Sequence, residues 1–165
     1  MDAKTHGNVL VLVGETKSAM GGSFALQLEP QMDCDNTLAE VCLNSGPANA
    51  AAVHQAIVSG LVCSAHDCSE GGVLLAASEM AFSGNLGITI ELPAEIPFET
   101  MCFAETPSRY LLEVDPRNVD EILEMLSEVS STIIGTFTTD KSVKANECCW
   151  NIDDLREVWL GGLQI

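Results

Sequence analysis

The apolar and polar positions along the 165-residue chain alternate in short runs that predict strands interleaved with helices. Alternating or brief continuous apolar runs favour strands, and apolar residues every three or four positions favour helices. The predicted strands are residues 8–14, 24–29, 61–67, 86–92, 109–114 and 132–138, and one further strand without fixed bounds is expected before the last helix. The predicted helices are residues 48–59, 70–83, 116–129 and 151–160. Residues 30–47 carry prolines and a glycine among polar positions, so they are predicted to be mostly loop.

Capping and turn residues support these boundaries. Gly21 and Gly22 predict a turn between the first two strands, and Ser69 is the expected N-cap of helix 70–83. Asp115 and Pro116 form a cap-and-first-turn pair for the next helix. Because strands and helices interleave and hairpins are also expected, the predicted fold class is α+β. This fold is a mixed α/β sandwich, with helices packed on a mixed sheet.

The length is typical of one domain, here residues 1–165, with residues 1–7 expected to be a flexible tail. Lys and Arg number 7 against 24 Asp and Glu, which gives a formal charge of −17. Such a balance argues against a nucleic-acid surface and against binding to anionic membranes. No apolar run approaches the roughly 20 residues that a membrane span requires. The scattered acidic residues are therefore interpreted as a solvated surface.

Seven cysteines are spread along the chain without a CxxC motif. Their odd number and the lack of a recognisable secretion signal predict free thiols in a reducing compartment. We therefore expect a cytoplasmic protein in which most thiols act as small buried apolar groups.

The stretch "SAHDCSEGG", residues 64–72, concentrates ionisable side chains and is open to several interpretations. Cys63, His66, Asp67 and Cys68 are all zinc ligand types. Side chains alternate along a strand, however, so Cys63 points away from His66 and Cys68 unless the chain bends sharply. Cys68 and His66 could instead form a nucleophile and its base.

A phosphate-binding turn is a third interpretation of the same stretch. A strand passes into a helix here, so unpaired backbone N–H groups point outward, and glycines allow a ligand to approach. Glu70 opposes an anion unless magnesium intervenes. The structural alternative is a capped helix whose polar groups are satisfied internally. The candidate binding residues are His66, Asp67, Ser69, Gly71 and Gly72.

A second candidate site is "FAETPSRYLLEV", residues 103–114, with Glu105, Ser108 and Arg109 just before a predicted strand. A guanidinium beside a hydroxyl suits a phosphate or a carboxylate ligand. The alternative is a local ion pair between Glu105 and Arg109.

The stretch "GETKSAMGGS", residues 14–23, supplies a third candidate. The backbone amides of Gly21, Gly22 and Ser23 could form a small anion-binding nest. The alternative is a plain hairpin loop.

These motifs, in this order, resemble the C-terminal segment of the phosphoribosylformylglycinamidine synthases. The matching stretches are "LVGETKSAMGGS", "SGLVCSAHDCSEGGVLLAASEMAFSGNLGITIEL", "FAETPSRYLLEV", "IGTFT" and "DDLREVWLGGL", from about Val9 to Leu163. Turns like "HDCSEGG" also occur in aminoimidazole ribonucleotide synthetases and selenophosphate synthetases. "ETPSRYLLEV" and "LREVW" make the resemblance specific to the synthases.

The resemblance implies a PurM-like C-terminal domain in an ATP-dependent ligase of purine biosynthesis. The full enzyme uses ATP, magnesium and a small-molecule substrate, formylglycinamide ribonucleotide. Its catalytic and metal-binding residues lie in N-terminal ATP-binding halves, on the same chain or a separate subunit, which are the implied partners. The 165-residue chain alone is then expected to hold no cofactor or metal and to have no catalytic residue.

A comparison with the first repeat of this family bears on the second candidate site. Glu105 and Arg109 match the ends of an ESQER-like substrate-binding pattern, whereas residues 106–108 depart from it. The resemblance therefore implies a pseudo-symmetric, non-catalytic half. Two other interpretations remain: a stand-alone binding or assembly subunit of a split synthase, and the C-terminal half of a related ATP-using enzyme of the aminoimidazole ribonucleotide synthetase type.

Overall fold

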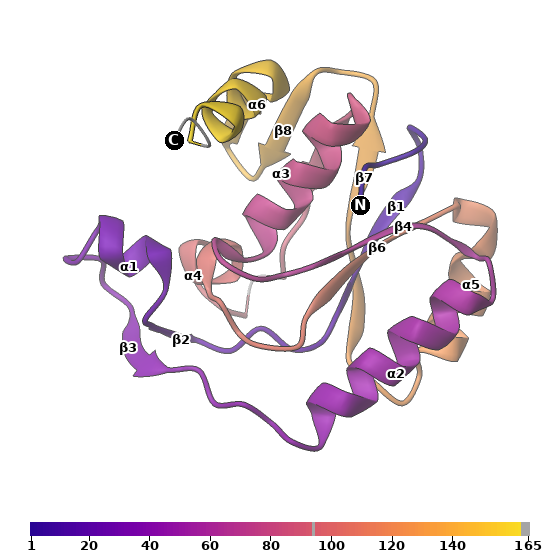
Figure 1. The fold of residues 1–165 in the computed structure, drawn as a ribbon, viewed down its shortest axis with the longest axis horizontal. Coiled ribbons are helices and arrows are strands. Elements are labelled where there is room, and N and C mark those ends of the chain that lie inside the picture. Colours follow the sequence, from indigo (N-terminus) through magenta and orange to yellow (C-terminus); the bar gives the residue numbers. More distant parts are fainter. Residues whose placement is uncertain (94, 163–165) are drawn as a thin grey trace.

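Most of the chain folds around one mixed sheet, which the computed structural model describes through residues 1–93 and 95–162 (Figure 1). The end of the predicted domain, residues 163–165, lies outside the described residues. The strand order is β4-β6-β1-β7-β5-β8-β9. Neighbouring strands are antiparallel except the parallel pair β5–β8. The strands are β1 Val9–Val13, β4 Val62–Asp67, β5 Gly87–Ile90, β6 Tyr110–Val114, β7 Ser131–Thr138, β8 Ser142–Ala145 and β9 Cys148–Asn151.

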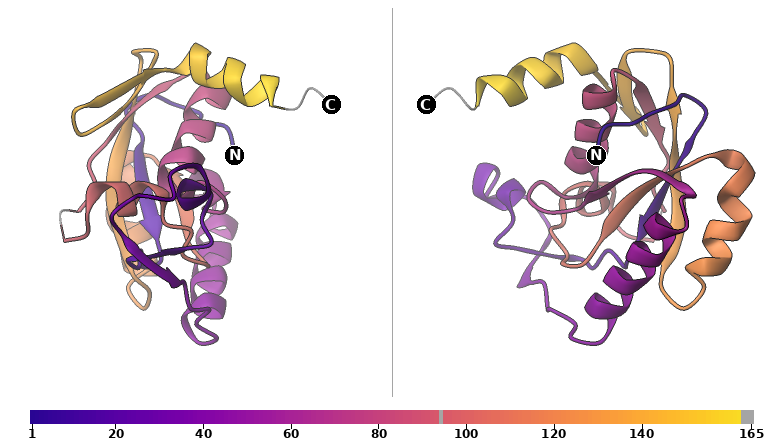
Figure 2. Two further views of the ribbon diagram at one scale, coloured as in Figure 1. Left: turned by 90° about the vertical axis from the view of Figure 1, so that its left-hand side faces the viewer. Right: turned by 45° about the vertical axis from the view of Figure 1, so that its right-hand side comes forward.

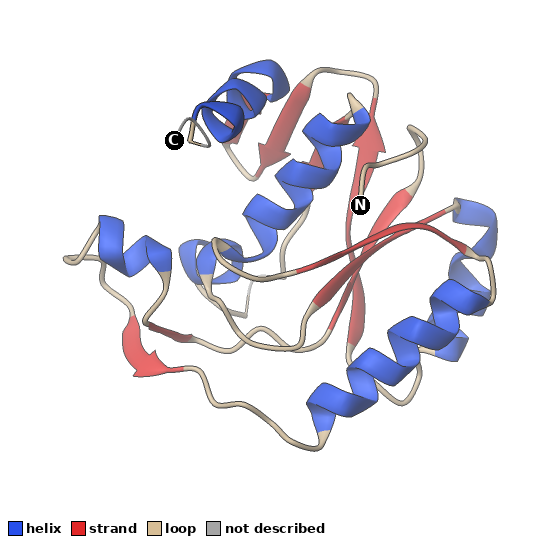
Figure 3. Cartoon of the chain, viewed as in Figure 1, coloured by secondary structure: helices blue, strands red, loops and turns tan. Residues whose placement is uncertain are grey.

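Helices cover both faces of this sheet, which confirms the predicted α+β class (Figure 3). They are α2 Ser45–Val58, α3 Gly72–Gly84, α4 Phe98–Phe103, α5 Val119–Met125 and α6 Ile152–Gly161. The alternation in β1 explains the two layers. Leu10 and Leu12 pack into the core beneath α3, whereas Val11 and Val13 face α2 and α5. Each such buried side chain contributes about 1.5–3 kcal/mol.

A small second sheet lies outside this sandwich (Figure 2). It pairs β2 Ala19–Gly21 with β3 Asp35–Leu38 in parallel, and α1 Phe24–Leu28 lies between them in sequence. A Cβ atom at Gly21 would lie 2.6 Å from the carbonyl oxygens of Asn36 and Thr37. Glycine at this position therefore permits the close approach of the two strands.

The predicted strand 24–29 is wrong, because these residues form α1. "FALQLE" alternates as a strand does, but Phe24 and Leu28 are also one helical turn apart, and short apolar runs fit both periods. The Ser23 hydroxyl accepts the N–H of Leu26 at 3.4 Å and caps the helix. β1 consequently pairs with β6 and β7 rather than forming the expected hairpin with residues 24–29.

The segment predicted as mostly loop, residues 30–47, contains β3 and the first turn of α2. All four residues of β3 are exposed, so the strand lacks the apolar alternation on which the prediction depended. Between strand 132–138 and the last helix, where one further strand without fixed bounds is expected, the structure has two, β8 and β9. The other predicted strands and helices agree with observed elements, although the helix expected at 116–129 divides into a 3₁₀ turn, Pro116–Asn118, and α5.

The expected cap at Ser69 is also wrong. Helix α3 begins at Gly72, and Gly71 precedes it with φ +77°, a left-handed conformation that favours glycine. The Ser69 hydroxyl instead donates a hydrogen bond of 2.7 Å to the Asp67 carboxylate. The backbone conformation of the glycine pair, rather than a serine cap, therefore starts this helix.

Residues 3–5, within the expected flexible tail, are hydrogen-bonded to the sandwich. The N–H of Ala3 donates to the Met80 carbonyl at 3.0 Å. The N–H groups of Lys4 and Thr5 donate to the buried carboxylate of Glu113, at 2.9–3.0 Å. The same carboxylate accepts hydrogen bonds from two side chains, Asn8 Nδ2 at 2.8 Å and Ser64 Oγ at 2.7 Å.

In residues 1–93 and 95–162, no helix combines the length and the apolar character that crossing a membrane requires.

Candidate functional site

The three candidate motifs meet at the carboxylate of Glu105. This residue follows α4, and its Oε1 accepts the N–H of Gly71 at 2.9 Å. The same oxygen accepts the N–H of Phe24, also at 2.9 Å. Gly71 belongs to the "SEGG" turn and Phe24 follows the "GGS" turn, so the structure brings together segments separated by 34 and 81 residues.

At the "SEGG" turn, the Gly71 amide that could have bound a phosphate is thus bound to an internal carboxylate. At the "GGS" turn, the Ser23 amide of the predicted nest donates to the Met20 carbonyl at 3.0 Å, and Glu105 binds the next amide along, that of Phe24. Glu105 supplies the negative charge that an unpaired N–H at a helix start attracts. Packing also requires glycine at position 72, since a Cβ atom there would lie 2.6 Å from the Cys102 carbonyl oxygen. Close packing of α3 against α4 therefore accounts for this glycine.

Arg109 holds the turn that carries Glu105. Its side chain is only 1% exposed, and Nε donates to the Thr106 carbonyl at 3.0 Å. Nη1 donates to the Thr16 hydroxyl at 2.8 Å, and Nη2 donates to the Ala104 carbonyl. Burial lowers the pKa of Arg109 from its ordinary value. The guanidinium therefore braces two backbone carbonyls and the Thr16 hydroxyl of its own chain.

Ser108 is held in a left-handed conformation, with φ +63°, between this turn and α2. Its carbonyl accepts the Asn49 Nδ2 at 3.0 Å. It also lines two cavities, one of about 380 Å³ beside α2 and one of about 400 Å³ beside the "SEGG" turn. The second cavity is lined by Asp67, Ser69, Glu70, Glu105 and Arg109, among others. Three carboxylates at its wall disfavour a polyphosphate.

The "SAHDCSEGG" stretch uses its polar groups internally. His66 Nε2 is buried and lies 2.9 Å from Glu79 Oε2 without meeting hydrogen-bond geometry, whereas Glu79 Oε1 accepts the Trp159 indole N–H at 2.9 Å. His66 Nδ1 lies 2.7 Å from the carbonyl oxygen of Asp67. The hydrogen bond from Ser69 lowers the pKa of Asp67. Ser69 and Asp67 therefore pair with each other rather than capping α3, and the buried His66 Nε2 has no hydrogen-bond partner among the described residues.

Cys68 is not a nucleophile in this arrangement. Burial raises the pKa of its thiol to about 12, so the reactive thiolate is scarce at neutral pH. The zinc interpretation has no support in the described part of the chain, where no group of three His, Cys, Asp or Glu side chains is arranged to hold a metal ion.

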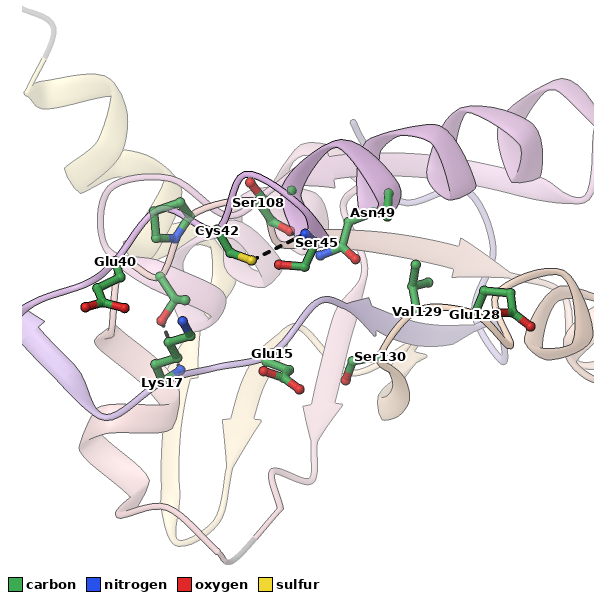
Figure 4. Close-up of a pocket in the computed structure, with 14 residues that line it drawn as sticks. Glu15, Lys17, Glu40, Cys42, Ser45, Asn49, Ser108, Glu128, Val129 and Ser130 are labelled. Carbon is green, nitrogen blue, oxygen red and sulfur yellow. Dashed lines mark hydrogen bonds between the residues drawn. The ribbon is translucent and has the colours of Figure 1, made fainter.

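Cys42 is a reactive-type thiol that the sequence did not single out. It lies before α2 at the wall of the 380 Å³ cavity, together with Lys17, Glu40 and Ser45 (Figure 4). Its Sγ accepts the N–H of Ser45 at 3.4 Å. Hydrogen bonds from Ser45 lower the pKa of Cys42 to about 7. Its position just before a helix start was the only available signal.

Comparison with known proteins identifies the fold that carries this arrangement. The family described as AIR synthase related protein, C-terminal domain, matches residues 5–146. The chain belongs to this family.

Two curated relatives of this AIR synthase related domain are phosphoribosylformylglycinamidine synthase subunits PurL. The one from Moorella thermoacetica is 35% identical over 134 residues, which cover 80% of this chain and 18% of that protein. The one from Alkaliphilus metalliredigens is 29% identical over 99% of this chain and 23% of that protein. The chain thus spans about a fifth of the length of these relatives.

Solved structures share the fold of this domain at low identity. Thermotoga maritima PurL complexed with FGAR has a TM-score of 0.79 and 19% identity, over 93% of this chain and 28% of that one. Escherichia coli HypE, a hydrogenase maturation protein, has a TM-score of 0.64 and 16% identity, over 91% of this chain and 50% of that one. The PurM-like fold implied by the sequence resemblance is therefore confirmed.

Several polar residues of this AIR synthase related domain escaped sequence reasoning. Glu113 is a carboxylate in an apolar strand, "YLLEV", and that anomaly was the available signal for its buried network. Glu79 and Asn49 lie inside helices with ordinary polar positions, so no local pattern marked their contacts with His66 and Ser108.

Proposed function

We propose that this chain is the last C-terminal domain of a phosphoribosylformylglycinamidine synthase. The observation that carries the proposal is the 35% identity to the Moorella thermoacetica subunit across 80% of the chain. The order of "ETPSRYLLEV" and "LREVW" motifs supports the synthase over a related ATP-using enzyme of the same fold.

The full enzyme would convert formylglycinamide ribonucleotide, with ATP and ammonia from glutamine, to formylglycinamidine ribonucleotide. In such a reaction ATP activates the amide oxygen, and magnesium with positioned charges stabilises the transferred phosphoryl group. The partners of this domain would be the N-terminal ATP-binding halves, on the same polypeptide or on another subunit.

Within that enzyme, this domain would be a non-catalytic half that maintains architecture. The residues present do not fit a magnesium–triphosphate group by themselves. The Gly71 amide is occupied by Glu105, and Asp67 and Glu70 add negative charge to the same cavity. The buried Arg109 is committed to three oxygens of its own chain. These contacts support a structural role, in which Glu105 substitutes for the anion of an active half.

The proposal is tested with two proteins, each mixed with formylglycinamide ribonucleotide, ATP, magnesium and ammonia. The first is the 165-residue chain, for which we expect no product. The second is a full-length chimera, in which the chain replaces the matched segment of the Moorella thermoacetica subunit. We expect the chimera to form product, whereas the same subunit lacking that segment does not. Turnover by the chain alone, or an inactive folded chimera, would contradict the proposal.

We also propose a cytoplasmic location for this domain. All seven cysteines are free thiols, including the exposed Cys148 and Cys149, which are adjacent in sequence. Free surface thiols are typical of a reducing compartment, and this observation supports the proposal.

A further inference from the structure

The segment 24–43, here named the arm, exposes apolar side chains without forming a core of its own. It contains α1 and β3 and extends beyond the main sheet (Figures 1 and 2). No residue from 24 to 48 is buried. Leu28, Leu38 and Leu43 are each at least 75% exposed. The exposed large apolar residues of the arm are Phe24, Leu28, Leu38, Val41 and Leu43.

This arrangement is unfavourable for an isolated domain. Ordering a backbone costs about 1–2 kcal/mol per residue, and buried apolar surface is the usual compensation. The arm is held by the short β2–β3 pairing, the Ser23 cap and the Phe24–Glu105 hydrogen bond. Five large apolar side chains exposed within twenty residues of sequence favour an interaction surface, because covering them removes apolar area from water.

The charge of the arm restricts what can cover it. Glu29, Asp33, Asp35 and Glu40 lie in the arm, and the segment contains no Lys or Arg. A second copy of the chain would bring the same four carboxylates and a formal charge of −17 to the interface. Like charges directed at each other disfavour such a pair. The complementary surface is therefore apolar with Lys and Arg at its rim.

Polypeptide that could supply this surface exists in the relatives. The chain matches only 18% and 23% of the two curated subunits, so most of such a protein lies outside these 165 residues. We propose that the arm docks onto an apolar face with a basic rim on the N-terminal ATP-binding portion of the synthase. This inference rests on the proposed function, and it assigns a docking role to residues 24–43.

Docking at the arm would also cover a cavity. Glu40 and Cys42, at the C-terminal end of the arm, line the 380 Å³ cavity beside α2. Leu43 directly follows Cys42 in the chain, so a partner that covers Leu43 would also shield the Cys42 thiol. Access of small reagents to the Cys42 thiol becomes a direct report of docking.

The experiment compares the 165-residue chain with the full-length chimera described above. Amide hydrogen exchange of residues 24–43 is measured in both, together with the alkylation rate of Cys42 by iodoacetamide. We expect both rates to fall at least about tenfold in the chimera, because docking removes the arm from solvent. The double variant Leu38→Glu/Leu43→Glu should restore both rates to those of the chain alone. Val158→Glu is the matched control, since Val158 on α6 is 77% exposed and lies outside the arm.

Three results would overturn the inference. One is equal exchange of the arm in the chain and the chimera. Another is an equal effect of Val158→Glu and of the double variant. The third is self-association of the 165-residue chain, seen by sedimentation and abolished by the double variant, because a second copy would then cover the arm.

If the chimera does not fold, a capture experiment tests the same inference. The tagged 165-residue chain is co-expressed with the Moorella thermoacetica subunit lacking its matched segment, and complexes are captured on the tag. Capture by the wild-type chain and loss with Leu38→Glu/Leu43→Glu supports docking, and no capture contradicts it. Product formation separates the two proposals: an active chimera with an unprotected arm contradicts only docking, and an inactive chimera with a protected arm contradicts only the proposed function.

Discussion

Glu105 accepts the Gly71 amide at 2.9 Å, across 34 residues of sequence. The same oxygen accepts the Phe24 amide, so one carboxylate ties the starts of α1 and α3 to the end of α4. An amide that is free to bind a ligand in an open turn is satisfied within the chain here. Glu105 is therefore the residue on which the architecture of the candidate site depends.

Replacing Glu105 should loosen both turns. Glu105→Ala leaves two backbone N–H groups without their acceptor, and we expect a loss of about 2 kcal/mol in the free energy of unfolding. Glu105→Gln keeps one acceptor oxygen and should cost about 1 kcal/mol. Urea denaturation followed by circular dichroism measures both values. Glu99→Gln, at an exposed position of α4, should be near neutral, and an equal effect there would remove the special role of Glu105.

Arg109 should stabilise the fold through its set of hydrogen-bond donors more than through its positive charge. Arg109→Ala removes the donors to Thr106, Ala104 and Thr16 and leaves a void, so we expect a loss of about 3 kcal/mol or more. Arg109→Lys keeps the charge but not the fork of donors, and it should recover less than half of that loss. Arg117→Ala is the control, because Arg117 is exposed and its replacement should leave stability nearly unchanged. Full rescue by lysine would show that charge alone matters.

The buried Glu113 should anchor the N-terminal segment. In Glu113→Gln the side-chain NH₂ group faces donors such as Asn8 Nδ2 and the Lys4 amide, so we expect a loss of about 2–3 kcal/mol. The amides of Lys4 and Thr5 should exchange with solvent much faster than in the wild-type chain, as hydrogen exchange with NMR would measure. Glu91→Gln, at an exposed position, is the matched control. Unchanged exchange at Lys4 and Thr5 would contradict the anchoring role.

Cys42 should react near neutral pH. Its pKa of about 7, against an ordinary value near 9, means that the thiolate fraction rises about tenfold between pH 6 and pH 8. Alkylation of the folded chain by iodoacetamide, followed by mass spectrometry, should therefore show a midpoint near pH 7 at this residue. Cys68 and Cys102 should resist the reagent, because burial raises the pKa of each to about 12. The fast phase should vanish in Cys42→Ser, and a midpoint near pH 9 would contradict the prediction.

Ser69 should act on Asp67 rather than on the helix start. Its hydrogen bond lowers the pKa of Asp67, so Ser69→Ala should raise that pKa toward the ordinary value of about 3.9, as carboxyl NMR titration would measure. A lowered pKa stabilises the folded state above the unfolded pKa, and this contribution is lost as the pH falls through the folded pKa. The stability difference between the two proteins should accordingly be present at pH 6 and be lost as the pH falls through the folded pKa of Asp67. Ser69→Thr keeps the hydroxyl and should behave as the wild type.

Local patterns predicted the strands and helices of the sandwich well where the buried positions recur with the period of the strand or helix. The strand predicted at 132–138 is β7, Ser131–Thr138, and the strand predicted at 8–14 is β1. The alternation of β1 is informative because its two faces lie in two different cores. Exposed β3 carries no such signal, since its residues need not be apolar on either face. The prediction for α1 was wrong for a related reason. "FALQLE" fits both the strand and the helix period, and only the Ser23 cap and the Glu105 contact decide between them.

The sequence by itself determined the class of fold, the main strands and helices, and which short motifs deserved chemical attention, because each depends on residues within a few positions of one another. The tertiary structure alone decided what those motifs do. Glu105 binds Gly71 and Phe24, and Arg109 binds Thr16, only because the sheet order brings β1, β4 and β6 together. A contact across 34, 81 or 93 residues depends on that packing, and no local window of sequence contains it.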